Sequence, residues 1–489
     1  MSNESVYDYC IVGAGTIGSY IAEKLILKMP NSRICIVESD DVEKVRVCTS
    51  SKSNYSGLKV GRAFGFGGTS RLWGGQMISM VEDDFLSRVG GRIHAWPLNF
   101  SELNSYYYIV IKKIFGFKYS EELIRKLAPK YNYLNELDLI CRTSIWIPSK
   151  KRNIWKQYGK NICKNSKIIN NFAEQLKFEK NGTSKYCLVT CDKQQNRTNI
   201  SAKKFILCLG AAETEALIKR SKDLDNIKTF SICDHISFIA GKLDIIDYQK
   251  FHDLFASEFF RGLVISKKFE LNNKPELNIL PKFNFKFIAQ KNNDPFFSTV
   301  KILLDFLQGK SKSLPKIKLN QIFYISYCGL ILLFYKYFYK RLWLPKSIDY
   351  YLTIDIEQMP DVSNKIYEKN GKLTLNWSLM PDDLNSLDRI KTLVKEYINL
   401  NFSNIIKIND TKTNDANFYD VYHPFNNLRM GRDPKNSSVD INLNLWNKKE
   451  IYVCSTGVFP SLGSANPGLT NFALAERLVE HLVFLESEK

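Results

Sequence analysis

Three glycines near the start of the chain have the spacing of a phosphate-binding turn. The stretch YDYCIVGAGTIGSYIAEKL places Gly13, Gly15 and Gly18 between an apolar run and a helical pattern. The first glycine permits the tight bend, the second lets the backbone approach a pyrophosphate, and the third allows close packing of helix and strand. The N-terminus of the helix would then face the phosphates, because its free N–H groups and its dipole attract negative charge.

An acidic residue completes this pattern. The apolar run RICIVES leads into Glu38, at the position about 20 residues beyond the glycines where an acid accepts hydrogen bonds from a ribose. Three glycines alone are a weak signal and also occur in ordinary strand–helix turns. Strand, glycines, helix, strand and acid together predict an adenine-dinucleotide site.

Length and composition limit the classes of protein to which the chain can belong. The 489 residues are 44% apolar and 13% aromatic, which excludes a disordered protein and predicts large cores, in two domains. The eleven cysteines are scattered and several lie in apolar, strand-like runs, so we expect reduced core thiols in a cytoplasmic protein. The polar start, MSNESVYD, predicts no signal peptide, and five histidines without a cluster predict no metal site.

A second glycine-rich loop, GRAFGFGGTSRLWGG, follows the first unit. Repeated glycines suit a backbone that lies against a flat ligand and offers its N–H groups to it. A mobile surface loop is the alternative, but Phe64, Phe66, Leu72 and Trp73 make this stretch too apolar for that. We therefore expect the loop to contact the ligand.

The remaining elements can position these loops. Residues 83–160 are mainly helical in pattern, and residues 166–200 alternate like a strand meander. In AKKFILCLGAAETEALI, a buried strand, a turn at Gly210 and a helix would bring another backbone segment to the same nucleotide. The last 70 residues return to strand, loop and helix.

Seven motifs together resemble the glucose–methanol–choline (GMC) family of flavin-dependent oxidoreductases. After the N-terminal fingerprint come, in the family's order, GGTSRLWGG, AWP, FILCLGAAET, DH, YHPFNNLRMGRDP and SANPGLTNFALAERL. The last two are the most specific. The resemblance covers both ends of the chain and is poor from about 240 to 345.

The resemblance implies an α/β (α+β) fold with two parts. A Rossmann-like FAD-binding domain would comprise residues 1–93, 164–237 and 418–489. A smaller substrate-binding domain, built on an antiparallel sheet plus helices, would comprise residues 94–163 and 238–417. The implied cofactor is FAD.

The same resemblance places a catalytic pair at His423 and Asn466. A neutral imidazole can take the hydroxyl proton of an alcohol, and an amide can hold the alcohol oxygen and orient its C–H bond. His423 could instead be a buried, hydrogen-bonded histidine, and Asn466 before Pro467 could initiate a turn. His235 is expected to be structural.

The predicted cofactor-binding residues belong to the glycine loops, to the turn after the third strand and to the last two motifs. They are Gly13, Gly15, Thr16, Ile17, Gly18, Glu38, Gly67, Gly68, Thr69, Trp73, Gly74, Gly75, Gly210, Gly457, Asn466 and Pro467. Two departures from the family matter. Asn426 and Asn427 replace a small Gly-Thr pair and would narrow the pocket or move the base. SRLWGG contains no histidine, so we expect the FAD to be bound non-covalently.

A basic, aromatic segment spans residues 282–346, where twelve Lys or Arg residues face two Asp residues. Within it, IFYISYCGLILLFY, residues 322–335, is free of charge but shorter than the ~20 residues of a membrane span. Its edges of Lys, Tyr and Trp343 are typical of an interfacial anchor, and a buried helix is the equal alternative. An anionic membrane surface is therefore a candidate partner. No nucleic-acid module is recognisable.

These features together predict a cytoplasmic FAD-dependent oxidoreductase, peripheral on the inner membrane face if the segment is an anchor. It would oxidise a CH–OH group of a sugar or another alcohol, by proton abstraction at His423 and hydride transfer to flavin, and pass electrons to an acceptor that no motif identifies. The competing class is a non-redox or degenerate flavoprotein of the same fold, with a lyase or binding role.

Overall fold

The structure of the protein is a computed structural model. It describes residues 6–40, 47–50, 53, 55–116, 120–131, 133–134, 138–179, 185–272, 274–289, 298–299, 319–369, 372–410 and 418–488.

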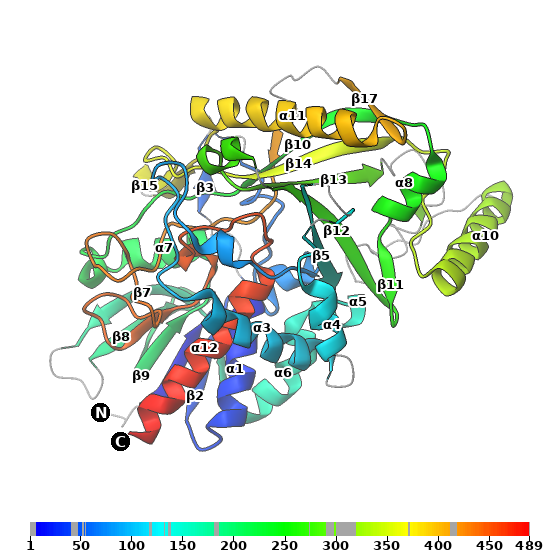
Figure 1. Cartoon of the computed structure of the whole chain (residues 1–489). Coiled ribbons are helices and arrows are strands. Elements are labelled where there is room, and N and C mark those ends of the chain that lie inside the picture. The colour runs from blue at the N-terminus through cyan, green and yellow to red at the C-terminus, as the bar shows by residue number, and fades with distance from the viewer. Residues whose placement is uncertain are drawn as a thin grey trace.

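A mostly parallel sheet forms the centre of the first half of the molecule (Figure 1). Its strands are β1 (Tyr7–Val12), β2 (Ile34–Val37), β6 (Lys167–Ile169), β7 (Phe172–Phe178), β8 (Tyr186–Cys191), β9 (Arg197–Leu207) and β19 (Ile451–Val453). Their order is β6-β2-β1-β9-β8-β7, and β19 also pairs with β9. β1 pairs in parallel with both β2 and β9, while β7 and β8 form an antiparallel meander with β9. β1 and β2 are almost wholly apolar because a parallel sheet is covered on both faces.

Helices from distant parts of the chain cover this sheet. They are α1 (Thr16–Lys28), α3 (Phe100–Phe115), α6 (Ile154–Asn165), α7 (Ala211–Arg220) and α12 (Gly468–Ser487). α1 packs against α6 and α12, and α12 packs against α3. A buried hydrogen bond from the Tyr20 hydroxyl to Glu476 joins α1 to α12, so the two ends of the chain share one core.

An antiparallel sheet forms the second half and lies above the first in Figure 1. Its strands are β4 (Gln76–Met77), β5 (Leu139–Trp146), β10 (His235–Ile245), β11 (Glu258–Phe260), β12 (Leu263–Leu271), β13 (Phe283–Ala289), β14 (Tyr350–Glu357), β17 (Ile406–Asp410) and β18 (Phe418–Asp420). The main order is β17-β10-β14-β13-β12-β5-β4. Helices α8 (Tyr248–Phe255) and α11 (Pro381–Phe402) pack on it over a second, phenylalanine-rich core.

Shorter elements join these two halves. They are β3 (Cys48–Thr49), β15 (Lys365–Lys369), β16 (Lys372–Asn376), α4 (Ser120–Leu127), α5 (Ser149–Arg152), and the single turns η1 (Gly68–Arg71), η2 (Glu82–Phe85), η4 (Lys222–Leu224), η5 (Pro275–Ile279) and η8 (Thr456–Val458). β15, β16 and β3 form a small sheet of their own.

The predicted fold class is confirmed. Residues 94–163, expected in the substrate-binding domain, contribute to both halves, since α3 and α6 from this range pack on the first core. Their apolar faces are covered by α12 and α1. Within this range, the strand β5 belongs to the antiparallel sheet.

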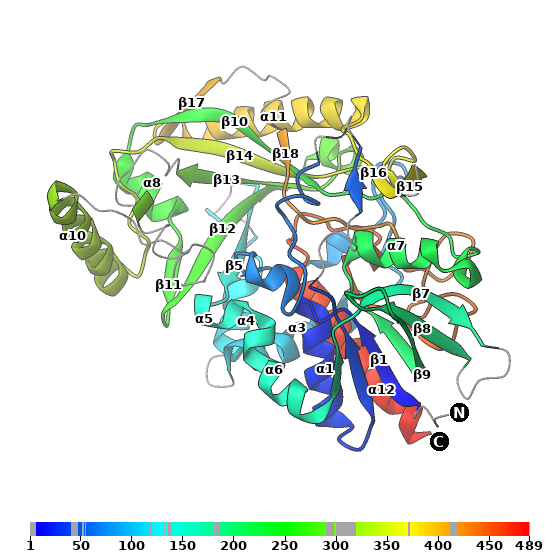
Figure 2. The ribbon, with the colours of Figure 1, turned by 180° about the vertical axis from the view of Figure 1, so that it is seen from behind.

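The apolar segment 322–335 forms most of α10 (Leu319–Phe334), which continues into a π-helical turn, η6 (Tyr335–Tyr339). Figures 1 and 2 both show α10 at the edge of the molecule, beyond α8 and β11. Of residues 322–339, all of which the structure describes, only Cys328 is buried. The helix is therefore not the buried core helix that the sequence left open.

Candidate functional site

A cavity of about 570 Å³ lies where β1, β2 and β9 end at their carboxyl edges. Gly13 follows β1, Glu38 follows β2, and Cys208 to Gly210 follow β9. Ligands bind at this edge of parallel α/β sheets, and the volume lies in the range of ligand sites. The cavity extends from these turns to His423 and Asn466, which line its other end.

The first glycine turn has the geometry that its spacing predicts. Gly13 has φ +101°, a conformation that side chains rarely adopt, and a Cβ there would lie 2.8 Å from the Cys208 carbonyl oxygen. A Cβ at Gly18 would lie 1.8 Å from the carbonyl oxygen of Gly13. Gly18 thus sets the close packing of α1 on the turn, while Gly15 lines the cavity.

Glu38 holds the turn and faces the cavity. Its carboxylate accepts hydrogen bonds from the backbone N–H of Ala14 at 2.6 Å and of Ser39 at 2.9 Å. Burial raises the pKa of Glu38 to about 7, although these two N–H donors oppose the rise. The backbone N–H of Gly65 is a third donor to this carboxylate, which keeps one lone pair with which it could accept a ribose hydroxyl.

The second glycine loop packs directly on the first. The N–H of Gly67 donates to the carbonyl of Ala14 at 2.8 Å, and a Cβ at Gly68 would lie 2.8 Å from the Cα of Gly15. The two backbones therefore meet without intervening side chains. Trp73 is held by a 2.9 Å hydrogen bond from its indole N–H to the Arg152 carbonyl, and it closes one wall of the cavity.

Three helices begin at the cavity: α1 at Thr16, α7 after Gly210, and α12 at Gly468. At none of these three N-termini does the N-cap side chain accept a hydrogen bond from the first turn. Three sets of N–H groups and three positive dipole ends therefore converge on one cavity, which suits an anionic ligand such as a pyrophosphate.

Asp234 organises the opposite end of the cavity. Its buried carboxylate accepts the backbone N–H groups of His235 at 2.7 Å and of His423 at 2.9 Å, and the Tyr55 hydroxyl at 2.6 Å. Burial, reinforced by the nearby Asp420, raises the pKa of Asp234 well above its ordinary value. One side chain thus fixes the backbones of two histidines that lie 188 residues apart in the chain.

Hydrogen bonding determines which nitrogen of His423 is free. Nε2 of His235 lies 2.8 Å from the Gly463 carbonyl oxygen, which can only accept, so this nitrogen carries a hydrogen. Burial lowers the pKa of both histidines, which are therefore neutral at pH 7. Nδ1 of His235 is then an acceptor for Nδ1–H of His423, 3.4 Å away. This leaves Nε2 of His423 unprotonated, with a free lone pair.

The Asn466 amide is oriented by a lysine that the sequence analysis missed. The ammonium of Lys268 lies 2.9 Å from Oδ1 of Asn466, and an ammonium can only donate. The amide nitrogen must therefore point the other way, where it donates to Oε1 of Gln76 at 3.3 Å and keeps a second hydrogen. Burial lowers the pKa of Lys268 to about 8, against the favourable charge of Asp355 at 3.4 Å.

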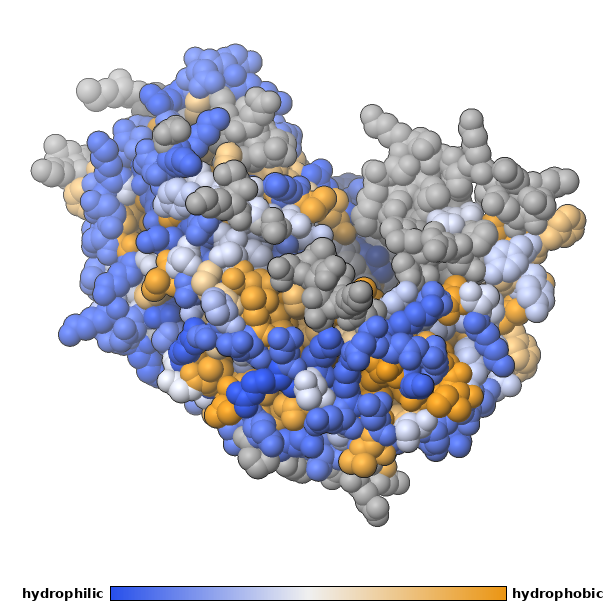
Figure 3. Space-filling view, turned by 90° about the horizontal axis from the view of Figure 1, so that it is seen from above, coloured by the Kyte–Doolittle hydropathy of each residue, from blue (hydrophilic) through white to orange (hydrophobic). Residues whose placement is uncertain are grey.

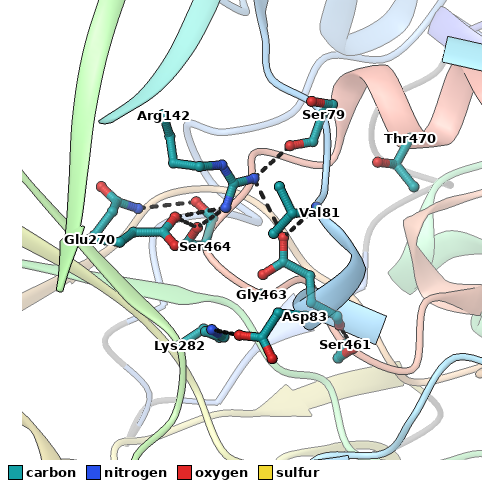
Figure 4. A network of polar contacts seen from close by, with 12 residues as sticks. Ser79, Val81, Asp83, Arg142, Glu270, Lys282, Ser461, Gly463, Ser464 and Thr470 are labelled. Atoms are coloured by element: carbon teal, nitrogen blue, oxygen red, sulfur yellow. Dashed lines mark hydrogen bonds and ion pairs between the residues drawn. The ribbon is translucent and has the colours of Figure 1, made fainter. Parts of the chain in front are cut away.

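The loop before Asn466, residues 461–465, is held mainly from the antiparallel sheet. Figure 4 shows Arg142 donating to Glu270, to Ser464 and to the Ser79 carbonyl, at 2.7, 3.0 and 2.6 Å. The N–H groups of Leu462 and Gly463 donate to the buried carboxylate of Glu357, at 2.7 and 3.1 Å. Since one partner of each contact belongs to a strand or to a buried ion pair, the loop has little freedom, and neither has Asn466.

Most predicted site residues lie together. All except Gly18, Gly67 and Gly457 line the cavity, and those three lie in the backbone just behind it. Asn426 and Asn427 are buried outside the lining, where they donate to the carbonyls of Ser231 and Ala211. Of the two effects expected of this pair, they do not narrow the pocket.

Comparison with known proteins supports this assembly. A family model described as GMC oxidoreductase, which covers the C-terminal domain of that family, matches residues 367–475. No curated protein sequence matches the chain significantly. Among solved structures, the chain is similar to pyridoxine 4-oxidase from Mesorbium loti, at 16% identity and a TM-score of 0.55, over 97% of this chain and 99% of that one.

Two further solved structures have a similar fold. A formate oxidase matches at 14% identity and a TM-score of 0.57 over all of both chains. A fungal aryl-alcohol oxidase matches at 12% identity and a TM-score of 0.54, over 99% of this chain and 100% of that one. Another structure, of the formate oxidase of Aspergillus oryzae RIB40, concerns modification of its FAD and matches at 13% identity, with a TM-score of 0.56, over all of both chains. The chain thus carries the C-terminal domain of the GMC oxidoreductases on a fold shared with solved oxidases, which confirms its resemblance to that family.

Proposed function

We propose that the protein binds FAD non-covalently and oxidises the CH–OH group of a sugar or another small alcohol. The observation that carries this proposal is the free Nε2 lone pair of His423, held by His235 at the end of a cavity whose other end has the features of a dinucleotide site.

The cavity fits the cofactor. Glycine backbones meet where a Cβ would clash with the neighbouring turn or loop, the N-termini of α1, α7 and α12 line the cavity and suit an anionic group, and Glu38 lines it where an acid could bind a ribose. Among the residues that line the cavity, His423 is the only histidine, and SRLWGG has none, which favours non-covalent binding. Bound FAD would supply the acceptor for the hydride that leaves the C–H bond.

The protein's own residues would prepare the alcohol. Nε2 of His423 accepts the hydroxyl proton, because the hydrogen bond from its Nδ1–H to His235 directs this lone pair away from the protein core. The second N–H of Asn466 donates to the alcohol oxygen as negative charge develops there. Lys268 strengthens that donor by polarising the amide through Oδ1.

An anaerobic titration of the purified holoenzyme with alcohols and sugars tests this proposal. We expect a substrate to bleach the flavin absorbance, and His423→Ala to slow bleaching by at least ~10²-fold, because a general base typically contributes that much. Asn466→Ala should slow the same step less, since it removes orientation rather than the base. Acid precipitation should release the flavin into the supernatant in every variant.

His481→Ala is the matched control, because His481 lies on α12 against Tyr452 and outside the cavity lining. Bleaching of the His423 variant at the wild-type rate, with unchanged flavin content, would rule out His423 as the base. Flavin that no alcohol or sugar bleaches would instead favour the non-redox flavoprotein of the same fold. Flavin that stays in the acid pellet would contradict non-covalent binding.

A further inference from the structure

The apolar face of α10 is turned outward. Large hydrophobic side chains at Phe323, Tyr327, Leu330, Phe334 and Tyr337 are 77%, 61%, 68%, 47% and 61% exposed. Their spacing of three or four residues places them on one face of the helix. A surface helix normally turns such a face toward the core, so α10 has the reverse orientation and a face that requires a partner.

The C-terminal end of α10 is tied to the body by contacts of the residues that follow it. There the N–H of Phe259 donates to the Lys340 carbonyl at 2.6 Å, Arg341 pairs with Asp253, and the N–H of Leu342 donates to the Ser257 carbonyl at 2.7 Å. Figure 3, viewed from above, shows hydrophobic side chains at the right-hand edge, which is where α10 lies in Figure 1. Residues 340–342 thus fix the position of α10 on the folded body, and its apolar face is turned outward.

Charge distinguishes among the partners that could cover this face. Lys340 and Lys346 are exposed at the base of the helix, and residues 319–346 include no Asp or Glu. A second copy of α10 would therefore bring more lysine and no counter-charge from this segment. An anionic bilayer offers both an apolar layer for the helix face and negative headgroups for the lysines.

Two basic residues of the predicted range, residues 282–346, have acidic partners within the protein. Lys282 pairs with Asp83, and Lys286 pairs with Asp355. Six of the twelve basic residues, Lys291, Lys301, Lys310, Lys312, Lys316 and Lys318, lie outside the described residues. Of the described lysines in this range, the exposed ones are Lys340 and Lys346, which follow α10 and η6.

Connectivity determines how the helix meets the bilayer. Of the helices in the described part of the chain, one, Ile322–Tyr339, is long and apolar enough to cross a membrane. β13 and Arg341 both belong to the folded body, so the chain between them must cross a membrane an even number of times or not at all. Between β13 and α10, residues 290–318 have no run of more than six residues without a charge, so they provide no second span.

We propose that α10 is an interfacial anchor that lies in the headgroup region of an anionic membrane, with the face of Phe323, Tyr327, Leu330, Phe334 and Tyr337 toward the acyl chains. The helix lies along the membrane surface, and Lys340 and Lys346 contact anionic headgroups at its base. The enzyme is thereby held at the surface without spanning the bilayer.

Co-sedimentation of the holoenzyme with lipid vesicles tests the anchor. We expect recovery with phosphatidylcholine vesicles that contain phosphatidylglycerol to exceed recovery with pure phosphatidylcholine, and to fall as salt is added. Phe323→Ser with Leu330→Ser should weaken vesicle binding at least ~10-fold, because two apolar side chains leave the acyl boundary. Lys340→Gln with Lys346→Gln should weaken binding to the anionic vesicles about 25-fold, or about fivefold per lysine.

Matched controls separate a docking effect from a general one. Val362→Ser with Leu400→Ser replaces residues that are 86% and 82% exposed elsewhere, and Lys193→Gln with Lys222→Gln removes the same charge from other exposed sites. Neither pair should change vesicle binding, and flavin content should be equal in all variants. The proposal is overturned by equal recovery with both kinds of vesicle, by no recovery with either, by equal losses in the controls, or by a solution dimer that Phe323→Ser dissociates and that binds no vesicle.

Discussion

The two ends of the cavity are built in different ways. The nucleotide end consists of backbone: two glycine loops that touch each other, with the N-termini of α1 and α7 beside them. The reacting end consists of side chains from β10, β12 and two loops, joined by hydrogen bonds between residues about 190 or more positions apart. The nucleotide end requires glycines, because their missing side chains let the backbones meet. The reacting end requires particular donor and acceptor atoms. Substitutions should therefore act oppositely: an added methyl group destroys the first end, and a removed donor or acceptor weakens the second.

Gly18→Ala should have the largest effect. The new Cβ would lie 1.8 Å from the carbonyl oxygen of Gly13, so α1 must move away from the turn. We expect a loss of at least about 3 kcal/mol in the free energy of unfolding, together with loss of bound flavin. Thermal unfolding and the flavin-to-protein absorbance ratio measure both. Gly329→Ala, where nothing lies within 4 Å of the added carbon, should change neither. A Gly18→Ala protein with full flavin and unchanged stability would show that the backbone end tolerates side chains.

His235→Phe should have the next largest effect, and this effect should be on the rate of flavin reduction rather than on folding. Without the acceptor at His235, Nδ1–H of His423 loses its partner and the ring loses its fixed tautomer. We expect flavin reduction to slow about 10- to 100-fold, the range found when outer-shell partners of a functional histidine are removed, with flavin content unchanged. His235→Gln should restore much of the rate, because an amide can both donate to the Gly463 carbonyl and accept from His423. Equal rates for the Phe and Gln variants would contradict the proposed hydrogen-bond chain.

Lys268→Met should have the smallest effect on the rate of flavin reduction. The pH dependence of that rate should show the role of Lys268. The pKa of Lys268 is lowered to about 8, so its ammonium is present below pH 8 and is lost as the pH rises through that value. Wild-type flavin reduction should therefore fall above about pH 8. Lys268→Met should be about tenfold slower at neutral pH, as for the loss of one charged hydrogen bond, and should show no such fall.

Lys267→Met is the control for this variant. Lys267 is the next residue in β12 and is also buried, but it pairs with Glu258 at 3.2 Å instead of contacting Asn466. Its variant should keep the alkaline fall. Lys268→Arg should keep most of the rate while moving the fall to higher pH, because a guanidinium does not titrate in this range. Persistence of the fall in Lys268→Met would assign it to another group.

The same contrast explains what the sequence could predict. The nucleotide end was predictable because the demand for glycine at Gly13, Gly15 and Gly18 is local and its spacing is fixed. The fold class came from the family resemblance that the motifs carry. The packing of α3 and α6 on the first core could not be predicted, because their partners come from distant parts of the chain.

The reacting end was predicted only in part. His423 and Asn466 came from the family resemblance, and His235 was expected to be structural, whereas Lys268 belongs to none of the motifs. Their roles depend on strand registers that bring β10 and β12 to one place, and no short motif encodes these. One signal was available: in LVISKKFEL, alternation along a strand turns two adjacent lysines to opposite faces, so one of them must face inward.

The position of Asn466 in the chain has a consequence for the order in which the enzyme can be made. β1, α1 and β2 emerge early in synthesis and can pair at once, but the wall formed by residues 463–468 comes more than 400 residues later. Until α12 packs beside α1, the cavity lacks one wall and the glycine loops are uncovered. Glu270 and Glu357, which accept hydrogen bonds from residues 462–464, then have no partners in this loop. A growing chain therefore carries an open, apolar cleft for most of its synthesis. The docking of α12 therefore completes the reacting end and closes the N-terminal core in one late step.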